Sequence, residues 1–409
     1  MSRILVATGN LAQPGGSETY VLTIAEHLVR LGHTVTLLAR HAGESANLAE
    51  AMGIPVMQDV SQLSDTFDGI FSLDREFALL LSVLYPQTAR VFIMHNVDEA
   101  YLPPPVPNCV DATVALNERH EMRARAAEGS GKVVRLRQPI DTRRFSPRGR
   151  ISTRPLRVAL LGNYGHHPGE HRERLQEAWG DDIEWVEVGG AARTTNVSDA
   201  IANVDVVVGY GRSIMEAMSC ARAAYVFEHV GSSGWVTPDN YDAMEADGFS
   251  GVSVRDPANV ETLRADLKLY SPDLGWQGRE LIRRHHDARE HANHLVRVMR
   301  EIAPRPCLLD HQEFQALAAM IRVTLLLSEV AHGRVLEAEL LAQKLQTVTQ
   351  ENMLLKNENF AVKRESTRIE RDSKSPDNSV AAIYATRRWR MGSTLAAPID
   401  WLRGTFRKD

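Results

Sequence analysis

The chain has 409 residues, a length that suggests two or three domains. Hydrophobic residues make up 44% and charged residues 24%, ordinary proportions for a soluble globular protein, and the formal net charge is −5. A net negative charge argues against attraction of the whole molecule to nucleic acid. The three cysteines, Cys109, Cys220 and Cys307, form no Cys-x-x-Cys pair, which argues against a zinc site or a disulfide framework.

The N-terminal half begins as alternating strands and helices. Residues 3–8 (RILVAT) predict a buried parallel strand, and a glycine loop at 14–18 leads into an amphipathic helix over about 19–31. Gly32 ends that helix, and residues 33–39 (HTVTLLA) predict the next strand of a βαβ unit. With further strands at 69–72, 91–94 and 112–116, residues 1–150 are predicted to form one Rossmann-like domain.

A polar segment, 137–147, then marks a boundary, because it carries two prolines and precedes a new strand at 156–161. A helix over about 169–179 and a strand over 183–190 continue a second βαβ series. A closing helix is predicted over 278–302. Residues 151–303 are therefore predicted to form a second Rossmann-like domain.

The most informative stretch starts with a nearly continuous β-branched run, Val204–Val208, typical of a strand buried on both faces. Gly209 and Gly211 allow a sharp turn and a close approach to a ligand. Ser213 predicts the N-cap of a following helix, with Glu216 at the capping-box spacing. The free N–H groups of such a helix start bind phosphate-bearing ligands beyond the carboxyl end of a parallel strand.

This stretch resembles the retaining, nucleotide-sugar-dependent glycosyltransferases of the GT-B class, family 4. In that family a Gly-x-Gly turn precedes a helix carrying Glu-Ala-Met, and Glu216-Ala217-Met218 occupy that place here. The resemblance covers about residues 1–303 and implies two Rossmann-like domains facing a crevice. It implies that Glu216 binds the donor ribose, while the turn holds the diphosphate through Gly209, Gly211, Arg212 and Ser213.

The resemblance also implies that residues 151–303 are the nucleotide-sugar-binding domain and residues 1–150 the acceptor-side domain. Gly15, Gly16 and Ser17 match a glycine loop whose backbone N–H groups face the diphosphate or the acceptor. His95 matches a histidine that follows a strand and lies close to the donor sugar. The alternatives are an ordinary tight turn and a structural histidine at a strand end.

Two positions depart from the family pattern. Val208 stands where the family has a second glutamate, which helps to hold the donor sugar or its phosphate. The loop 162–167 lacks the usual Arg-Lys pair, so Arg212 is the candidate to neutralise the diphosphate. An exposed turn residue is the alternative for Arg212.

No Asp-x-Asp pair, the metal-binding pattern of another glycosyltransferase class, occurs in the chain. We therefore expect no metal and no other cofactor, with the nucleotide sugar as co-substrate and with helix N-termini and basic side chains stabilising the leaving diphosphate. The adjacent His285 and His286 point in different directions and are predicted to be surface residues rather than metal ligands. The segment 231–235 (GSSGW) follows a predicted strand end and is a candidate to cradle the nucleotide or sugar.

The C-terminal region differs in kind. Residues 310–372 predict one long helix with a heptad seam, in which Asn352 and Asn359 occupy equivalent positions and favour a two-stranded coiled coil. We expect a homodimer through residues 335–370; a helix packed back on the enzyme is the alternative. The basic, aromatic tail at 380–409 suits an anionic membrane surface, and docking on the acidic body is its alternative.

No stretch near the N-terminus is long and apolar enough for a secretory signal, and no apolar run approaches the roughly 18 residues of a membrane span. We therefore expect a cytoplasmic protein with a candidate peripheral contact to the inner face of the cell membrane.

The sequence thus predicts a metal-independent, retaining glycosyltransferase that moves a sugar from a nucleotide-sugar donor to a glycan or glycolipid acceptor, a cell-envelope polysaccharide or lipid-linked glycan. His95 and Glu216 are its candidate catalytic residues. One alternative is a catalytically degenerate scaffold or nucleotide-sugar-binding protein, favoured by Val208 and the missing basic pair. Another is a sugar-nucleotide epimerase of the same fold, which would need no acceptor.

Overall fold

The computed structural model describes residues 1–95, 109–127, 129–162, 168–189, 196–228, 231–251, 259–305 and 315. They belong to one compact unit, Met1–Ile321, and the second unit, Arg322–Asp409, lies outside them. The coiled coil at 310–372 (apart from Gln315) and the tail at 380–409 therefore stay predictions. Cys307 and residues 163–167 also lie outside the described residues.

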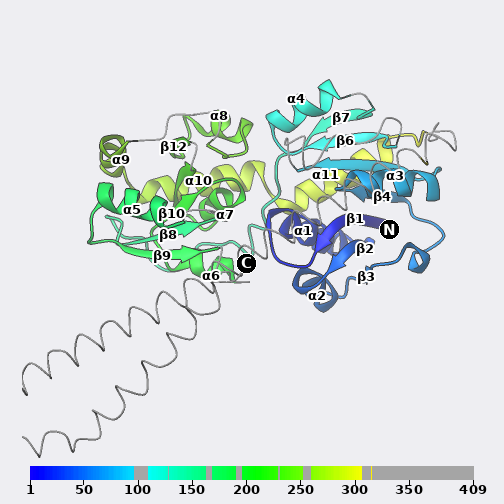
Figure 1. The fold of residues 1–409 in the computed structure, drawn as a ribbon, viewed down its shortest axis with the longest axis horizontal. Coiled ribbons are helices and arrows are strands. Elements are labelled where there is room, and N and C mark those ends of the chain that lie inside the picture. The colour runs from blue at the N-terminus through cyan, green and yellow to red at the C-terminus, as the bar shows by residue number, and fades with distance from the viewer. Residues whose placement is uncertain are drawn as a thin grey trace, which may run out of the picture. The chain divides into compact units, whose positions relative to one another are not determined.

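The described residues contain a seven-stranded sheet in the order β3-β2-β1-β4-β5-β6-β7, in which all neighbouring strands are parallel (Figure 1). The strand order reverses between β1 and β4, and ligands of open parallel sheets bind outside the carboxyl ends at such a reversal. The strands are β1 (Arg3–Leu11), β2 (Thr34–Ala42), β3 (Val56–Met57), β4 (Gly69–Ser72), β5 (Ala89–Met94), β6 (Ala112–Ala115) and β7 (Lys132–Arg135).

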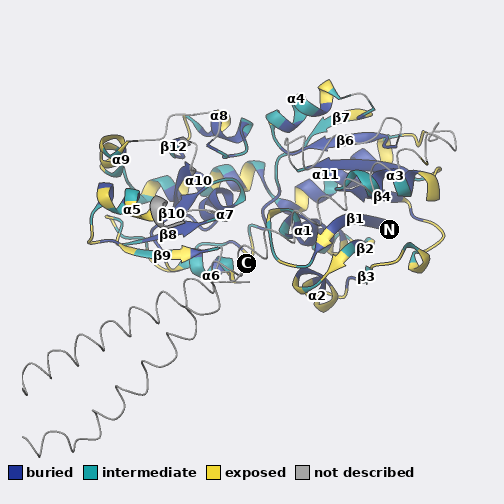
Figure 2. Cartoon of the chain, viewed as in Figure 1, coloured by how far each residue is buried: buried dark blue, intermediate teal, exposed yellow. Residues whose placement is uncertain are grey.

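Helices cover both faces of this sheet, which explains its continuous apolar strands. Along β1, Ile4 and Val6 join the core formed with α1, whereas Leu5 and Ala7 join the core formed with α3. Figure 2 shows β1 in dark blue along most of its length, as expected for a strand buried on both faces. The helical segments are α1 (Gly16–Arg30), α2 (Glu44–Ala51), η1 (Val60–Gln62), α3 (Arg75–Leu84) and α4 (Glu118–Ala126).

A second sheet among the described residues has five strands in the order β12-β11-β10-β8-β9, parallel except for the pair β11 and β12. Its order reverses between β8 and β10, where a second ligand site is expected. Its strands are β8 (Arg157–Leu161), β9 (Glu184–Val188), β10 (Val206–Gly209), β11 (Ala223–Glu228) and β12 (Gly231–Trp235). Its helices are α5 (Pro168–Trp179), α6 (Val197–Ala202), α7 (Arg212–Ser219), α8 (Tyr241–Ala246), α9 (Val260–Leu267) and α10 (Pro272–His285).

Residues 231–235 follow the end of β11, as expected, and themselves form the edge strand β12. Their contact with nucleotide or sugar stays a prediction. Trp235 is buried and stacks on Trp179 with 5.8 Å between the ring centroids, while its Nε1 donates to Asp266 O at 2.7 Å. Burial of this large ring fixes the segment against the second sheet.

The single helix predicted over 278–302 is two helices, α10 and α11 (Ala288–Glu301). Asp287 begins α11, because its Oδ1 accepts from Arg289 N at 2.9 Å and from Glu290 N at 3.1 Å. Leu295 and Met299 of α11 join the core of the first sheet, and Figure 1 shows α11 beside that sheet while α10 lies with the second. We call the first sheet with its helices and α11 the first half, and the second sheet with α5–α10 the second half.

We call residues 136–156, which join β7 to β8, the connecting segment. It is hydrogen-bonded to the break between α10 and α11. Ile140 N donates to His286 O at 2.7 Å, and Ala288 N donates to Ile140 O at 3.1 Å. Ile140 and Phe145 are buried in the core of the second half. Within the described ranges, no helix is long and apolar enough to cross a membrane.

Candidate functional site

The candidate site is built on the turn between β10 and α7, at the strand reversal of the second sheet. β10 is buried along its whole length and pairs with both β8 and β11. A Cβ on Gly209 would lie 2.5 Å from Leu161 O and 2.7 Å from Ser213 Oγ, so only glycine fits there. Gly211 has φ +61° and is the N-cap of α7.

The capping box predicted from Ser213 and Glu216 is absent. α7 begins at Arg212, one residue before Ser213, and Ser213 Oγ donates to Tyr210 O at 2.7 Å. Its hydroxyl therefore braces the turn rather than the helix start. The left-handed conformation of Gly211 lets the helix begin earlier than the side-chain pattern predicts.

Glu216 lies on the first turns of α7 and is paired with Arg212. Arg212 Nε donates to Glu216 Oε1 at 2.8 Å, and the two side chains are 9% and 8% exposed, with Arg212 given first. Burial raises the pKa of Glu216, and the positive charge of Arg212 opposes that rise. The carboxylate is thus held in a dry environment by one principal counter-charge.

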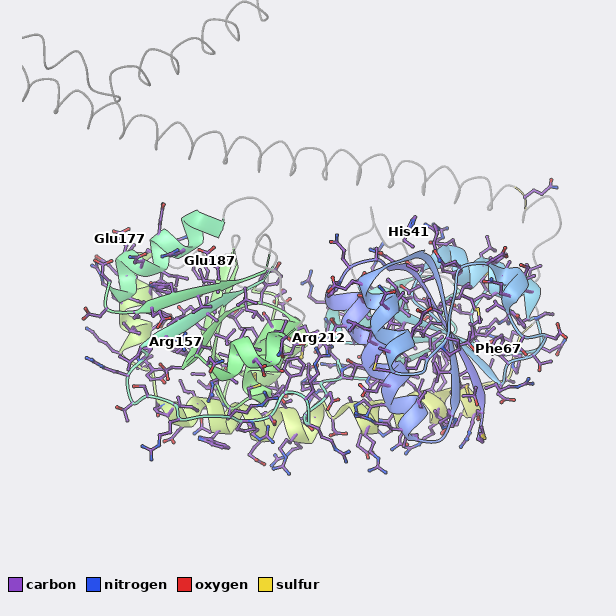
Figure 3. The ribbon with its side chains drawn as sticks, turned by 90° about the horizontal axis from the view of Figure 1, so that it is seen from below. His41, Phe67, Arg157, Glu177, Glu187 and Arg212 are labelled. Carbon is purple, nitrogen blue, oxygen red and sulfur yellow. The ribbon has the colours of Figure 1, made fainter. Side chains whose placement is uncertain are left out.

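Arg212, labelled in Figure 3, also contacts two other elements. Its Nη1 donates to Pro139 O at 3.0 Å, and its Nη2 lies 3.4 Å from Thr23 Oγ1 on α1. Arg212 is therefore not the exposed turn residue of the alternative interpretation. The guanidinium joins α7 to the connecting segment and to the first half.

The first glycine loop lies at the start of α1, after β1. Gly15 is the N-cap of α1, Gly16 is its first residue, and a Cβ on Gly16 would meet nothing within 4 Å. Ser17 Oγ donates to Glu18 Oε2 at 3.1 Å, and burial raises the pKa of Glu18. The helix start is accessible at Gly16, as a ligand-facing loop requires.

His95 follows the carboxyl end of β5. Its ring packs edge-on against Tyr20 of α1, with 4.4 Å between the centroids. Its Nε2 is buried without a hydrogen-bond partner among the described residues. Burial, together with the charges of His120, Arg212 and His291, lowers the pKa of His95 to about 3. His95 is therefore neutral at physiological pH and lies in the same neighbourhood as Arg212.

Sequence reasoning missed two histidines that hold the connecting segment. His291 Nδ1 is 2.9 Å from Arg137 O, and its Nε2 is 2.9 Å from the hydroxyl of Tyr20. His286 makes the same pair of bonds in the second half, to Gln138 O at 2.7 Å and to the Tyr241 hydroxyl at 2.7 Å.

A carbonyl only accepts, so each Nδ1 carries the proton and each Nε2 accepts from a tyrosine. The prediction that His286 is a surface residue was wrong: it is 2% exposed. The pair Asp287 and Glu290, at the spacing of a capping box, was the sequence signal for the helix break beside it.

Four polar side chains on one face of α1 were also missed. Tyr20, Thr23, His27 and Arg30 recur at spacings of three and four residues, the helical period, which was the available signal. His27 Nε2 and Arg30 Nη1 each lie 3.5 Å from Asp141 Oδ2 in the connecting segment. This face is thus turned to α11, to α7 and to the connecting segment.

Carboxylates of the second half also meet arginines of the first half. Glu245 is 2% exposed and pairs with both Arg135 and Arg137, the latter at 3.3 Å. Arg119 Nη1 lies 2.8 Å from Asp247 Oδ1. These ion pairs join β7 and α4 to the region of α8.

Asp74 is a further missed residue, at the strand reversal of the first sheet. It follows β4, and its carboxylate accepts from Gly9 N of β1. Burial and the charge of Glu76 raise the pKa of Asp74 to about 7. A carboxyl group that titrates near neutrality therefore lies where ligands of such sheets bind.

Within the described ranges, no group of three or more His, Cys, Asp or Glu side chains could hold a metal ion. That the reaction needs no metal remains a prediction.

Comparison with known proteins gave matches in structure only. No protein-family model and no curated protein sequence matches the chain. HepE of Anabaena, solved with UDP, matches at a TM-score of 0.55 and 11% identity over 73% of this chain and 100% of its own. An α-glucosyltransferase solved with UDP and a 13-mer DNA matches at 0.51 and 10% identity, over 73% of this chain and 100% of its own.

A glycosyltransferase of Rickettsia africae matches at 0.50 and 13% identity, over 73% of this chain and 98% of its own. The chain has the GT-B fold of these glycosyltransferases. The predicted fold class is confirmed for its two Rossmann-like parts.

Proposed function

We propose that the protein is a glycosyltransferase that transfers a sugar from a nucleotide-sugar donor to a glycan or glycolipid acceptor. The observation that carries the proposal is the buried carboxylate of Glu216 on α7, directly after a glycine turn at the strand reversal of the second sheet. In a GT-B fold, this is the position from which a carboxylate can bind the ribose of a nucleotide.

The proposed donor site uses the turn and the helix start together. Gly209, Gly211 and Ser213 leave the N-terminus of α7 close to a diphosphate, and Arg212 supplies the positive charge. The charge of Arg212 matters because the chain lacks the second glutamate of the family pattern. Val208, a buried apolar residue of β10, stands in its place. The solved structures of HepE with UDP and with UDP-glucose support a nucleotide sugar as the donor class.

The proposed acceptor side is the first half, near Gly16 and His95. A neutral His95 can exchange hydrogen bonds with a sugar hydroxyl but carries no charge to stabilise a leaving phosphate. We propose retention of configuration without a metal, with the leaving phosphate close to the acceptor hydroxyl. The acceptor proposed from the sequence is a cell-envelope polysaccharide or lipid-linked glycan, at the cytoplasmic face of the membrane.

Donor binding tests the proposal. UDP-, GDP-, dTDP- and ADP-glucose are titrated by calorimetry against the wild type, Glu216→Ala and the control Glu177→Ala, an exposed glutamate of the same half. We expect one donor to bind, Glu216→Ala to weaken that binding at least about tenfold, since a hydrogen-bonded charge is lost, and Glu177→Ala to leave it unchanged. Wild-type protein that binds none of the four would contradict the proposal.

Non-catalytic donor binding is the second candidate, favoured by Val208 and by the engagement of Glu216 with Arg212. Slow donor hydrolysis or transfer that depends on Glu216 would exclude it. Analysis of the product formed without acceptor separates an epimerase, which changes the donor sugar itself, from a transferase.

A further inference from the structure

The carboxylate proposed to bind the ribose is already occupied by a side chain of its own helix. Arg212 Nε donates to Glu216 Oε1 at 2.8 Å, and both side chains are less than one-tenth exposed. Arg212 Nε takes one lone pair of Oε1 and leaves others free, but the pair is so buried that a ribose diol can reach both carboxylate oxygens only if the side chains around them move. Arg212 is the side chain bonded to that carboxylate, so donor binding at Glu216 calls for a change at Arg212.

Arg212 cannot change alone, because its guanidinium has two other partners. Nη1 donates to Pro139 O at 3.0 Å, and Nη2 lies 3.4 Å from Thr23 Oγ1. The Thr23 hydroxyl donates to Thr19 O at 2.7 Å, so an oxygen lone pair is what it offers to Arg212. The three groups around the guanidinium thus come from α7, the connecting segment and α1.

We propose that Arg212 exchanges partners when the donor binds: it leaves Glu216 for the donor diphosphate, and this exchange weakens its contacts with Thr23 and Pro139 O. Donor occupancy is thereby coupled to α1, the helix that begins at the first glycine loop. This inference rests on the proposed function and adds a positioning role for Thr23.

The exchange predicts that Arg212 affects the affinity for a nucleoside and the affinity for its diphosphate in opposite directions. A nucleoside has the ribose but no phosphate, so it displaces Arg212 from Glu216 and offers the arginine nothing in return. A nucleoside diphosphate offers a double negative charge at the start of α7. Arg212 should therefore oppose binding of the nucleoside and favour binding of the diphosphate.

Calorimetry with uridine and UDP on wild type and Arg212→Ala tests this, with guanosine and GDP and adenosine and ADP as parallel pairs. For the pair whose diphosphate binds, we expect Arg212→Ala to lower the affinity for the diphosphate at least about tenfold. The same substitution should raise the affinity for the nucleoside about threefold. If the affinities for both ligands fell equally, Arg212 would have a purely structural role. If the affinity for the nucleoside did not change, Arg212 would not restrain Glu216. Either outcome overturns the inference, whereas wild type that binds none of these diphosphates and none of the four nucleotide sugars overturns the proposed function.

Arg125→Ala is the matched control, because Arg125 forms an exposed i,i+4 ion pair with Glu121 at 2.7 Å on α4. It should alter neither affinity. Thr23→Val tests the coupling without changing α7, and it remains informative if Arg212→Ala does not fold. It removes one anchor of Arg212, so we expect the affinities for both the nucleoside and the diphosphate of the pair that binds to rise about threefold. Unchanged affinities in Thr23→Val would contradict coupling to α1.

Discussion

His286 and His291 hold consecutive carbonyl groups of the connecting segment, with Nδ1 to oxygen distances of 2.7 Å to Gln138 and 2.9 Å to Arg137. Each ring accepts a tyrosine hydroxyl from a different half. The segment is therefore fixed from both halves by two rings that must stay neutral, since a protonated Nε2 could no longer accept.

These histidines predict acid sensitivity. Burial lowers the pKa of His286 to about 3 and that of His291 to about 3. In the unfolded chain a histidine titrates near about 6.5, so between these values the unfolded state binds more protons and stability falls as the pH falls. Each histidine contributes up to about 1.4 kcal/mol per pH unit below about pH 6.5.

Urea unfolding of wild type and His286→Asn between about pH 7.5 and pH 5 measures this slope. We expect a shallower pH dependence in His286→Asn and an unaltered one in the control His294→Asn, a less buried histidine of α11. Identical slopes in wild type and His286→Asn would refute the assignment.

We predict that Asp141 makes the free energy of unfolding depend on pH in a second, more acidic range. Burial alone would raise its pKa, but the contact with His27 and the N–H groups of Arg144 and Arg143 outweigh burial and hold the pKa well below its usual range. The unfolded state takes up protons first as the pH falls below roughly 3.9, so the stabilisation is present above that value and is lost below it.

Asp141→Asn keeps an acceptor but loses the charge, and should lower the free energy of unfolding by about 1.5–3 kcal/mol at neutral pH. The deficit relative to wild type should shrink in acid, as measured by urea unfolding at a series of pH values. A deficit that is constant down to about pH 2.5 would show that the charge is not responsible.

We predict that removing the buried charge of Glu245 lowers the free energy of unfolding strongly. Its carboxylate is 2% exposed and faces Arg135 and Arg137. Glu245→Gln leaves two arginines short of a counter-charge and should destabilise by about 3 kcal/mol. Glu118→Gln is the matched control, since Glu118 also pairs with Arg135 but is 52% exposed, and it should cost less than about 1 kcal/mol. Equal thermal shifts for the two variants would contradict the prediction.

We predict that any side chain at Gly209 destabilises the turn of the candidate site by steric overlap. The Cβ of Gly209→Ala would overlap Leu161 O and Ser213 Oγ, so the turn must shift, at a cost of about 1–3 kcal/mol. Gly16→Ala is the comparison, because its Cβ meets nothing within 4 Å and alanine favours the helix. Differential scanning calorimetry should show a lower melting temperature for Gly209→Ala alone; a stable Gly209→Ala protein would show that the turn has room.

Local patterns were sufficient to predict the strands and helices around the candidate site. The strand predicted at 69–72 agrees with β4, and the β-branched run ending at Val208 forms most of β10. Burial on both faces requires such runs, and the turn after β10 requires glycine, so both features are readable in the sequence. The helix start was predicted at the wrong residue, because the backbone of Gly211 capped α7 in place of Ser213.

By itself, then, the sequence determined the alternation of strands and helices, the fold class and the position of Glu216 after a glycine turn. Only the tertiary structure decided that Arg212 reaches Thr23, that Tyr20 bonds His291, and that α11 packs on the first sheet. Local periodicity depends on neighbouring residues, whereas these contacts join residues far apart in the chain. Thr23 and Arg212 are 189 positions apart, and Tyr20 and His291 are 271 positions apart, so nothing near either residue in the sequence specifies its partner.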